Sequence, residues 1–164
     1  MQTGQPKPTR WREGLINVRD DTLRQKKTFA RDLAHRRCLV LADSFYEWKK
    51  EEKRQKTPYR FQLKTGEIFA FAGIWEENED EDGHTLRTFA IITTDSNALV
   101  AKVHNRMPAM LTREAEKAWL DTNSTREHVL SMLAPYPASE MRTYEISPRV
   151  NRATEDTRDL IMPV

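Results

Sequence analysis

Short apolar runs, separated by charged and turn-forming residues, recur from residue 15 to the end of the chain. Runs and alternations of strand length predict strands at residues 15–19, 39–41, 45–48, 59–63, 68–74, 86–93 and 142–146. Apolar residues at helical spacing predict helices at residues 23–35, 95–103, 113–120 and 125–133. The pattern therefore predicts both strands and short helices, and the sequence contains no internal repeat.

The segment 38–48 has the sharpest pattern of the chain. Residues 39–41 form a continuous apolar run, which predicts a short strand buried on both faces. A polar turn follows, and then a second, aromatic strand that carries Glu47. Between Tyr46 and Trp48 the Glu47 carboxylate would be partly desolvated, and its pKa would rise toward the range useful for acid–base chemistry. The alternative is that Glu47 pairs with a nearby lysine on a solvated strand face.

Other predictions concern helix ends and loops. Thr112 is expected to cap the helix that follows it, because a short hydroxyl side chain accepts a hydrogen bond from a free N–H group at a helix start. The helix at 23–35 would have a basic outer face. Residues 49–56 and the acidic stretch 76–82 are expected to be loops. Residues 1–13, which are rich in proline and polar residues, are expected to form an N-terminal arm.

Length and composition indicate one folded and highly charged domain. The 164 residues suffice for a single domain with a real core. A hydrophobic content of 38% argues against disorder, while 32% charged residues and a mean hydropathy of −0.78 indicate a charged surface. We expect a cytoplasmic, nucleoid-associated protein, since no membrane-length apolar run or secretory signal is present. The single cysteine, Cys38, excludes an internal disulfide and is expected to be a core thiol.

The positive charge is concentrated in the first part of the sequence. Residues 1–64 contain 17 Lys and Arg against 8 Asp and Glu, whereas residues 65–164 contain 10 against 17. The basic part is interspersed with aromatic residues, a combination suited to single-stranded nucleic acid, whose bases are free to stack. The alternative is an ordinary charged surface on which the two parts of the sequence intermingle.

Common catalytic signatures are missing from the sequence. It contains no G-x-S-x-G, no P-loop and no H-E-x-x-H, and we expect neither a metal ion nor a cofactor. Among the four histidines, His104 stands out because it lies in a turn-forming stretch between a predicted helix and an apolar segment. Such connections often present side chains into a cleft. The alternative is a capping or surface histidine.

Three short motifs nevertheless occur in order along the chain: NVRDDT at 17–22, ADSFYEW at 42–48 and HNRMP at 104–108. With further similar stretches at 69–75, 91–94 and 150–151, this combination resembles the SRAP family (SOS response-associated peptidase). The resemblance extends from about residue 14 to the C-terminus. It implies an α+β fold, a single strand-rich mixed domain at residues 14–164 with short helices around a basic cleft. Members of the family act in the DNA damage response, bind single-stranded DNA and crosslink to abasic sites.

The resemblance also implies two groups of site residues. The first would be catalytic, moving protons and holding the reacting end at the abasic-site aldehyde: Glu47, His104 and Asn17. The second would bind DNA through phosphate contacts and stacking: Arg19, Trp48 and Arg106. For Arg106 a purely structural role is an equal alternative.

The start of the printed sequence departs from the family pattern. Family members begin Met-Cys-Gly-Arg, and their exposed terminal cysteine closes a thiazolidine ring on the aldehyde, whereas this sequence begins Met1-Gln2-Thr3. Cys38 is no substitute, because it has no free α-amine. Three interpretations stay open. The protein binds single-stranded or abasic DNA without that ring chemistry, it is an active peptidase or Schiff-base-forming enzyme using Glu47 and His104, or it is an assembly subunit completed by another chain at an open sheet edge.

Overall fold

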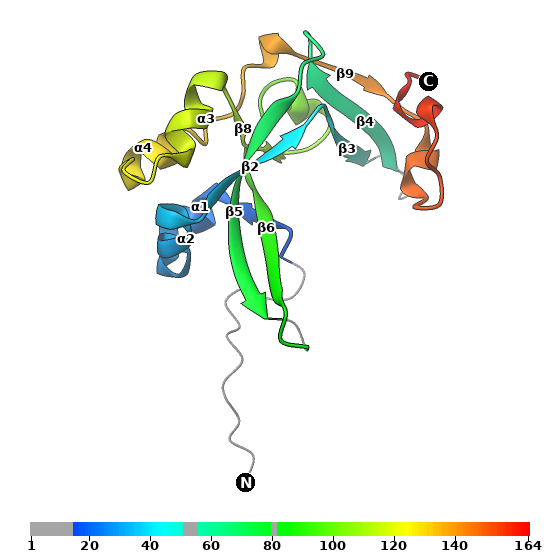
Figure 1. Cartoon of the computed structure of the whole chain (residues 1–164). Helices are drawn as coiled ribbons and strands as arrows, with labels where there is room; N and C mark the ends of the chain where they lie inside the picture. The colour runs from blue at the N-terminus through cyan, green and yellow to red at the C-terminus, as the bar shows by residue number, and fades with distance from the viewer. Residues whose placement is uncertain (1–14, 51–55, 80–81) are drawn as a thin grey trace.

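The computed structural model describes residues 15–50, 56–79 and 82–164, and two β-sheets dominate this part of the chain (Figure 1). The larger sheet has the order β1-β6-β5-β2, with β7 paired to β6 and β8 to β5. Its strands are β1 (Asn17–Arg19), β2 (Arg37–Ala42), β5 (Phe69–Glu79), β6 (Thr85–Asp95), β7 (Arg106–Pro108) and β8 (Met110–Leu111). Only the β1–β6 pairing among these described strands is parallel. The smaller sheet is antiparallel, in the order β3-β4-β9, and comprises β3 (Phe45–Lys50), β4 (Lys56–Leu63) and β9 (Met141–Glu145).

Short helices lie on one side of the larger sheet, and the smaller sheet lies on its other side (Figure 1). The α-helices in the described part of the chain are α1 (Asp20–Gln25), α2 (Ala30–His35), α3 (Arg113–Leu120) and α4 (Arg126–Ser131). Several 3₁₀ turns join the strands, including η3 (Val100–Lys102) and η5 (Pro148–Asn151). Within the described ranges, every helix is too short or too polar to cross a bilayer.

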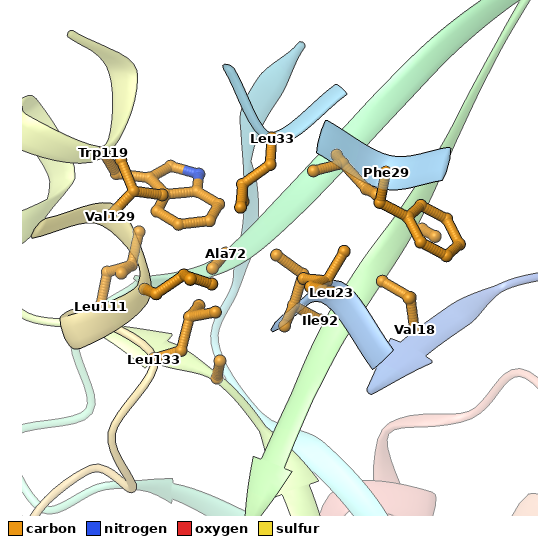
Figure 2. Close-up of a cluster of buried hydrophobic side chains, with 14 residues drawn as sticks. Val18, Leu23, Phe29, Leu33, Ala72, Ile92, Leu111, Trp119, Val129 and Leu133 are labelled. Atoms are coloured by element: carbon orange, nitrogen blue, oxygen red, sulfur yellow. The ribbon is translucent and has the colours of Figure 1, made fainter. Parts of the chain in front are cut away.

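Strand β5 separates two hydrophobic clusters because successive side chains of a strand point to opposite faces. Ala72 and Ile74 point toward the helices and join a cluster that includes Trp119 of α3, drawn in Figure 2. Phe69 and Phe71 point the other way and form edge-on contacts within a second cluster shared with the smaller sheet. The two clusters hold the helices and the smaller sheet against opposite faces of the larger sheet.

The helix predicted over 23–35 is wrong as a single element. The chain forms α1, then a 3₁₀ turn, then α2, and Lys26 between α1 and the turn is extended. Leu23, Phe29 and Leu33 are all buried in the helix-side cluster. In one continuous helix, with 3.6 residues per turn, Phe29 would lie about 120° around the axis from Leu23 and face away from that core. The break at Lys26 is therefore what lets the three side chains share one core.

Two predictions along the strands also need correction. The strand at 39–41 was expected to be buried on both faces, yet Leu41 is 67% exposed, because β2 is an edge strand of the larger sheet. The predicted acidic loop at 76–82 instead begins as a continuation of β5. Glu77 lies opposite Arg87 of β6 and forms an ion pair with it at 2.8 Å. Such a cross-strand pair stabilises a strand that looks like a loop in the sequence.

The helix predicted at 95–103 is reduced to the single 3₁₀ turn η3. The Asn97 side chain accepts hydrogen bonds from the backbone N–H groups of Leu99 and Val100, each at 3.0 Å, and donates to the carbonyl of Tyr136 at 2.7 Å. These contacts hold the chain in a local turn that competes with a helix.

Several local predictions are confirmed. The Thr112 hydroxyl caps α3 by accepting a hydrogen bond from the N–H of Ala115 at 3.3 Å. The aromatic segment at 45–48 lies in β3. The predicted loop at 49–56 shortens, since β3 continues to Lys50 and β4 begins at Lys56, and its middle falls outside the described residues, as does the predicted arm at 1–13.

Candidate functional site

Glu47 lies on β3 where the second hydrophobic cluster ends. Two positions earlier on the same face of the strand, Phe45 is buried and stacks on Phe61 of β4, with ring centroids 5.1 Å apart. This stacking fixes the strand, so that the Glu47 side chain is held beside the core and remains only 22% exposed. Tyr46 and Trp48, which the sequence predicted to desolvate Glu47, point to the opposite face of β3 and form an edge-on pair with each other, with centroids 6.5 Å apart.

His104 approaches Glu47 from the larger sheet, in the connection between η3 and β7. Its backbone N–H donates to the carbonyl of Val100 at 2.9 Å, and its Nδ1 lies 3.8 Å from Oε2 of Glu47. The same Nδ1 lies 3.2 Å from the backbone N–H of Arg106 and 3.1 Å from its carbonyl oxygen. Unprotonated Nδ1 accepts from that N–H, and protonated Nδ1 donates to the carbonyl and lies at ion-pair distance from Glu47. Both protonation states of the imidazole therefore have a partner, as a group that transfers protons requires.

The pKa of Glu47 is raised above its ordinary value. Burial of the carboxylate is the largest cause and outweighs the opposing effects of nearby His104 and of a hydrogen bond from the backbone N–H of Trp48. The predicted rise is thus confirmed, and the partner of Glu47 at this site is a histidine, where the sequence left open a lysine. A carboxyl group that keeps its proton closer to neutral pH is suited to general acid catalysis.

These two residues line a cavity of about 500 Å³ between the two sheets and the turn η5. The wall consists of Glu47, Trp48, Lys50, Lys56, His104 and Asn151. The Trp48 indole N–H donates to Oδ1 of Asn151 at 2.9 Å, which fixes the plane of the indole at the wall. The cavity thus combines an acid–base pair, an aromatic surface and two ammonium groups.

Strand β1 places Asn17 and Arg19 on the face of the larger sheet that looks toward the smaller sheet. Val18 between them is buried among the helix-side residues, whereas Asn17 lies opposite Ile91, which packs against the second cluster. This confirms that the two side chains point the same way. The exposed Arg19 donates to the Asp21 carboxylate at 2.6 Å, and this hydrogen bond is the main reason that the pKa of Asp21 is lowered.

Arg106 is only 12% exposed and joins three elements. Its guanidinium donates to Asp20 at 2.6 Å, to Asp95 at 2.7 Å and to the carbonyl of Thr93 at 2.5 Å. It therefore ties the start of α1 to β6 and β7, immediately beside His104. The structure accounts for this residue in structural terms, and its predicted contact with DNA stays a prediction.

Reasoning from the sequence missed three residues of the cavity wall: Lys50, Lys56 and Asn151. Asn151 belongs to one of the similar stretches, but nothing in the sequence pairs it with Trp48. The two lysines looked like part of an ordinary charged loop. Their significance appears only once the β3–β4 register places them at the cavity.

The Cys38 side chain is half-buried. Burial raises the pKa of the Cys38 thiol to about 11, so it is protonated at neutral pH, as expected of a structural thiol. Across residues 15–50, 56–79 and 82–164, no cluster of three His, Cys, Asp or Glu side chains is arranged to hold a metal ion.

Comparison with known proteins identifies the class to which this site belongs. The sequence model described as "SOS response associated peptidase (SRAP)" matches residues 4–153, and the chain belongs to this family. The strand-rich α+β fold is shared with a solved structure of a protein from Bacteroides thetaiotaomicron, with a TM-score of 0.83 and 32% identity, over 90% of this chain and 65% of that one. The predicted family and fold class are therefore confirmed.

Relatives with names that describe an activity are also similar. Abasic site processing protein YoqW of Bacillus subtilis is 42% identical over 148 residues, which cover 90% of this chain and 66% of YoqW. Abasic site processing protein HMCES of Rattus norvegicus is 31% identical over 95% of this chain and 52% of its own length. The chain thus spans between about half and two thirds of these relatives.

Proposed function

We propose that this SRAP protein binds single-stranded DNA and processes abasic sites within it, as part of the response to DNA damage. The names of YoqW and HMCES support this assignment. The observation that carries it is the Glu47–His104 pair at 3.8 Å, which lies in a cavity that also presents an aromatic ring and two ammonium groups. A DNA partner would also explain the predicted association with the nucleoid.

The chemistry of an abasic site matches this arrangement. The sugar opens to an aldehyde, an amine attacks its carbon, and the resulting carbinolamine must lose water to give an imine. Loss of water requires a proton on the departing oxygen, and Glu47, whose pKa is raised, would give it. His104 would then exchange the proton with Glu47. In the family the amine belongs to the first residue of the processed chain, and residues 1–14 here lie outside the described structure.

The other predicted residues would have supporting roles in this proposal. Asn17 would hold the reacting end, and Arg19 on the same face would contact phosphate, exchanging its ion pair with Asp21 for one with DNA. Trp48, whose indole is fixed by Asn151, would stack on a base next to the abasic site. Arg106 would act chiefly by keeping His104 in place.

Binding measurements test this proposal. Fluorescence anisotropy with labelled single-stranded DNA, duplex DNA and a single strand containing a stable abasic analogue should give tightest binding to the single strands, with affinity that falls steeply as salt rises. If Glu47 acts in proton transfer and not in DNA binding, the Glu47→Gln variant should bind single-stranded DNA with the affinity of the wild type. Equal affinity for single strand and duplex, or no binding to either, would remove the nucleic-acid assignment.

A second candidate role is self-association through β2. This edge strand borders an apolar groove of about 360 Å³, lined in part by Leu41, Trp75 and Phe89. Leu41 and Phe89 are 67% and 53% exposed, and one edge of β2 has no strand partner among the described residues. Exposed apolar side chains beside an open strand edge favour pairing with a second copy. Sedimentation velocity of the wild type and of Leu41→Lys tests this. A monomer at all concentrations for the wild type would reject the second candidate.

A further inference from the structure

The β3–β4 hairpin brings two lysines directly opposite each other at the mouth of the site. Lys50 is the last residue of β3 and Lys56 the first of β4, and the antiparallel register pairs them. Both side chains are exposed, and both line the cavity that contains Glu47 and His104. Trp48 lies two positions before Lys50 and therefore on the same strand face.

This pairing is unfavourable for the protein alone. Like charges directly opposite on neighbouring strands destabilise a sheet. No carboxylate in the described part of the chain forms an ion pair with either lysine, whereas arginines elsewhere in the fold have such partners. Lysines also occur on edge strands to prevent aggregation, and β3 is an edge strand. Among the described strands, Lys56 has β3 alone as a partner, because β4 pairs with β9 only from Tyr59 to Leu63. What distinguishes the two lysines from such a protective device is that both line the cavity.

We propose that Lys50 and Lys56 form a clamp for a DNA backbone phosphate adjacent to the nucleotide held in the cavity. This clamp rests on the proposed function, and its phosphate contact would fix which nucleotide of the DNA strand lies in the cavity. Two residues along a strand span about 6.7 Å. With a base stacked on Trp48, the two ammonium groups would therefore meet the phosphate next to that base. An anion between the lysines would also remove their mutual repulsion.

The test compares two double variants that lose the same charge. Lys50→Ala with Lys56→Ala removes the clamp, and Lys64→Ala with Lys117→Ala removes two exposed lysines that do not line the cavity. Affinity for single-stranded DNA is measured from 0.05 to 0.5 M salt. Each neutralised phosphate contributes about 0.7 to the slope of log affinity against log salt, so the clamp variant, which loses one phosphate contact, should lose about 0.7 from the slope. That corresponds to about fourfold weaker binding at 0.15 M salt, since this contribution vanishes near 1 M.

Stability provides a second, opposite readout. Removing facing like charges should leave the melting temperature of the free protein unchanged or higher, while DNA binding weakens. A merely structural role predicts a lower melting temperature, and Lys50→Arg with Lys56→Arg should retain both binding and slope. The clamp is overturned if the wild type binds single strands and the clamp variant matches the control pair in slope and affinity. If the wild type binds no DNA at all, the proposed function fails and the clamp fails with it.

Discussion

Replacing Arg106 with alanine should destabilise the fold strongly, because this side chain holds together parts of the chain that are far apart in sequence. It is 12% exposed and forms an ion pair at 2.6 Å with Asp20, whose side chain is 16% exposed. It also pairs with Asp95 and donates to the Thr93 carbonyl. The substitution leaves the Asp20 carboxylate largely buried without its strongest partner.

The magnitude follows from these exposures. Breaking one side of a buried ion pair costs roughly 3–5 kcal/mol, and partial exposure places the Arg106–Asp20 pair at the lower end, about 3 kcal/mol. The pair with Asp95 adds less than about 1 kcal/mol, since that carboxylate is 85% exposed. The expected loss is therefore about 3–4 kcal/mol in the free energy of unfolding, or roughly 10 °C in melting temperature for a chain of this size.

Urea denaturation of four proteins measures this effect: the wild type, Arg106→Ala, Asp20→Asn and the double variant. The two single changes should be non-additive by more than about 1.5 kcal/mol if the pair acts as the structure indicates. Arg31→Ala, an exposed arginine on α2, serves as the control and should change stability by less than about 0.5 kcal/mol. The reasoning is refuted if Arg106→Ala is as stable as the control, and a simultaneous loss of DNA affinity would then assign Arg106 to direct DNA contact.

Three further predictions concern the site residues and the proposed chemistry. The raised pKa of Glu47 means that its contribution to stability is fully present below the unfolded-state pKa and is lost as pH rises through the folded-state pKa. Relative to wild type, Glu47→Gln should therefore gain stability in urea titrations as the pH rises above the ordinary glutamate pKa of 4.5, and an unchanged difference would contradict the assignment. Arg19→Ala and Trp48→Ala should each weaken binding to single-stranded DNA by roughly 1–3 kcal/mol in anisotropy titrations, and normal binding by both folded variants would show that the roles do not transfer. A polypeptide of the printed sequence, with Gln2 where the family has cysteine, should give an adduct with abasic DNA on denaturing gels only when borohydride is added, and a heat-stable adduct without reductant would reveal another nucleophile.

The sequence predicted local elements well where a short pattern decides them. The aromatic run before Trp48 predicted β3, and the Thr112 cap predicted the start of α3, because strand alternation and capping depend on neighbouring residues. Errors arose where distant contacts decide the outcome. The extended conformation at Lys26 reflects a shared core, and the continuation of β5 past Glu77 reflects an ion pair with another strand.

At the site, too, the sequence predicted features that depend on neighbouring residues and missed those that depend on distant contacts. The sequence predicted the direction of the pKa shift of Glu47, but the burial that causes it comes from the packing of Phe45 on Phe61 of the neighbouring strand. Its proximity to His104 depends on how two sheets pack, and the sequence pointed to it only through the resemblance to a family. The opposition of Lys50 and Lys56 depends on hairpin register, and no residue pattern near either lysine predicts it.

The most direct test of the central claim is the initial rate at which borohydride traps the protein on abasic single-stranded DNA. Wild type, Glu47→Gln, His104→Ala and the exposed control Glu67→Gln are compared at neutral pH, after thermal melting confirms that each is folded. If Glu47 and His104 move protons at the aldehyde, both site variants should form the trapped adduct roughly 10²–10⁴ times more slowly than wild type, whereas the control keeps the wild-type rate. Equal rates for all four proteins would contradict the proposed function of this site.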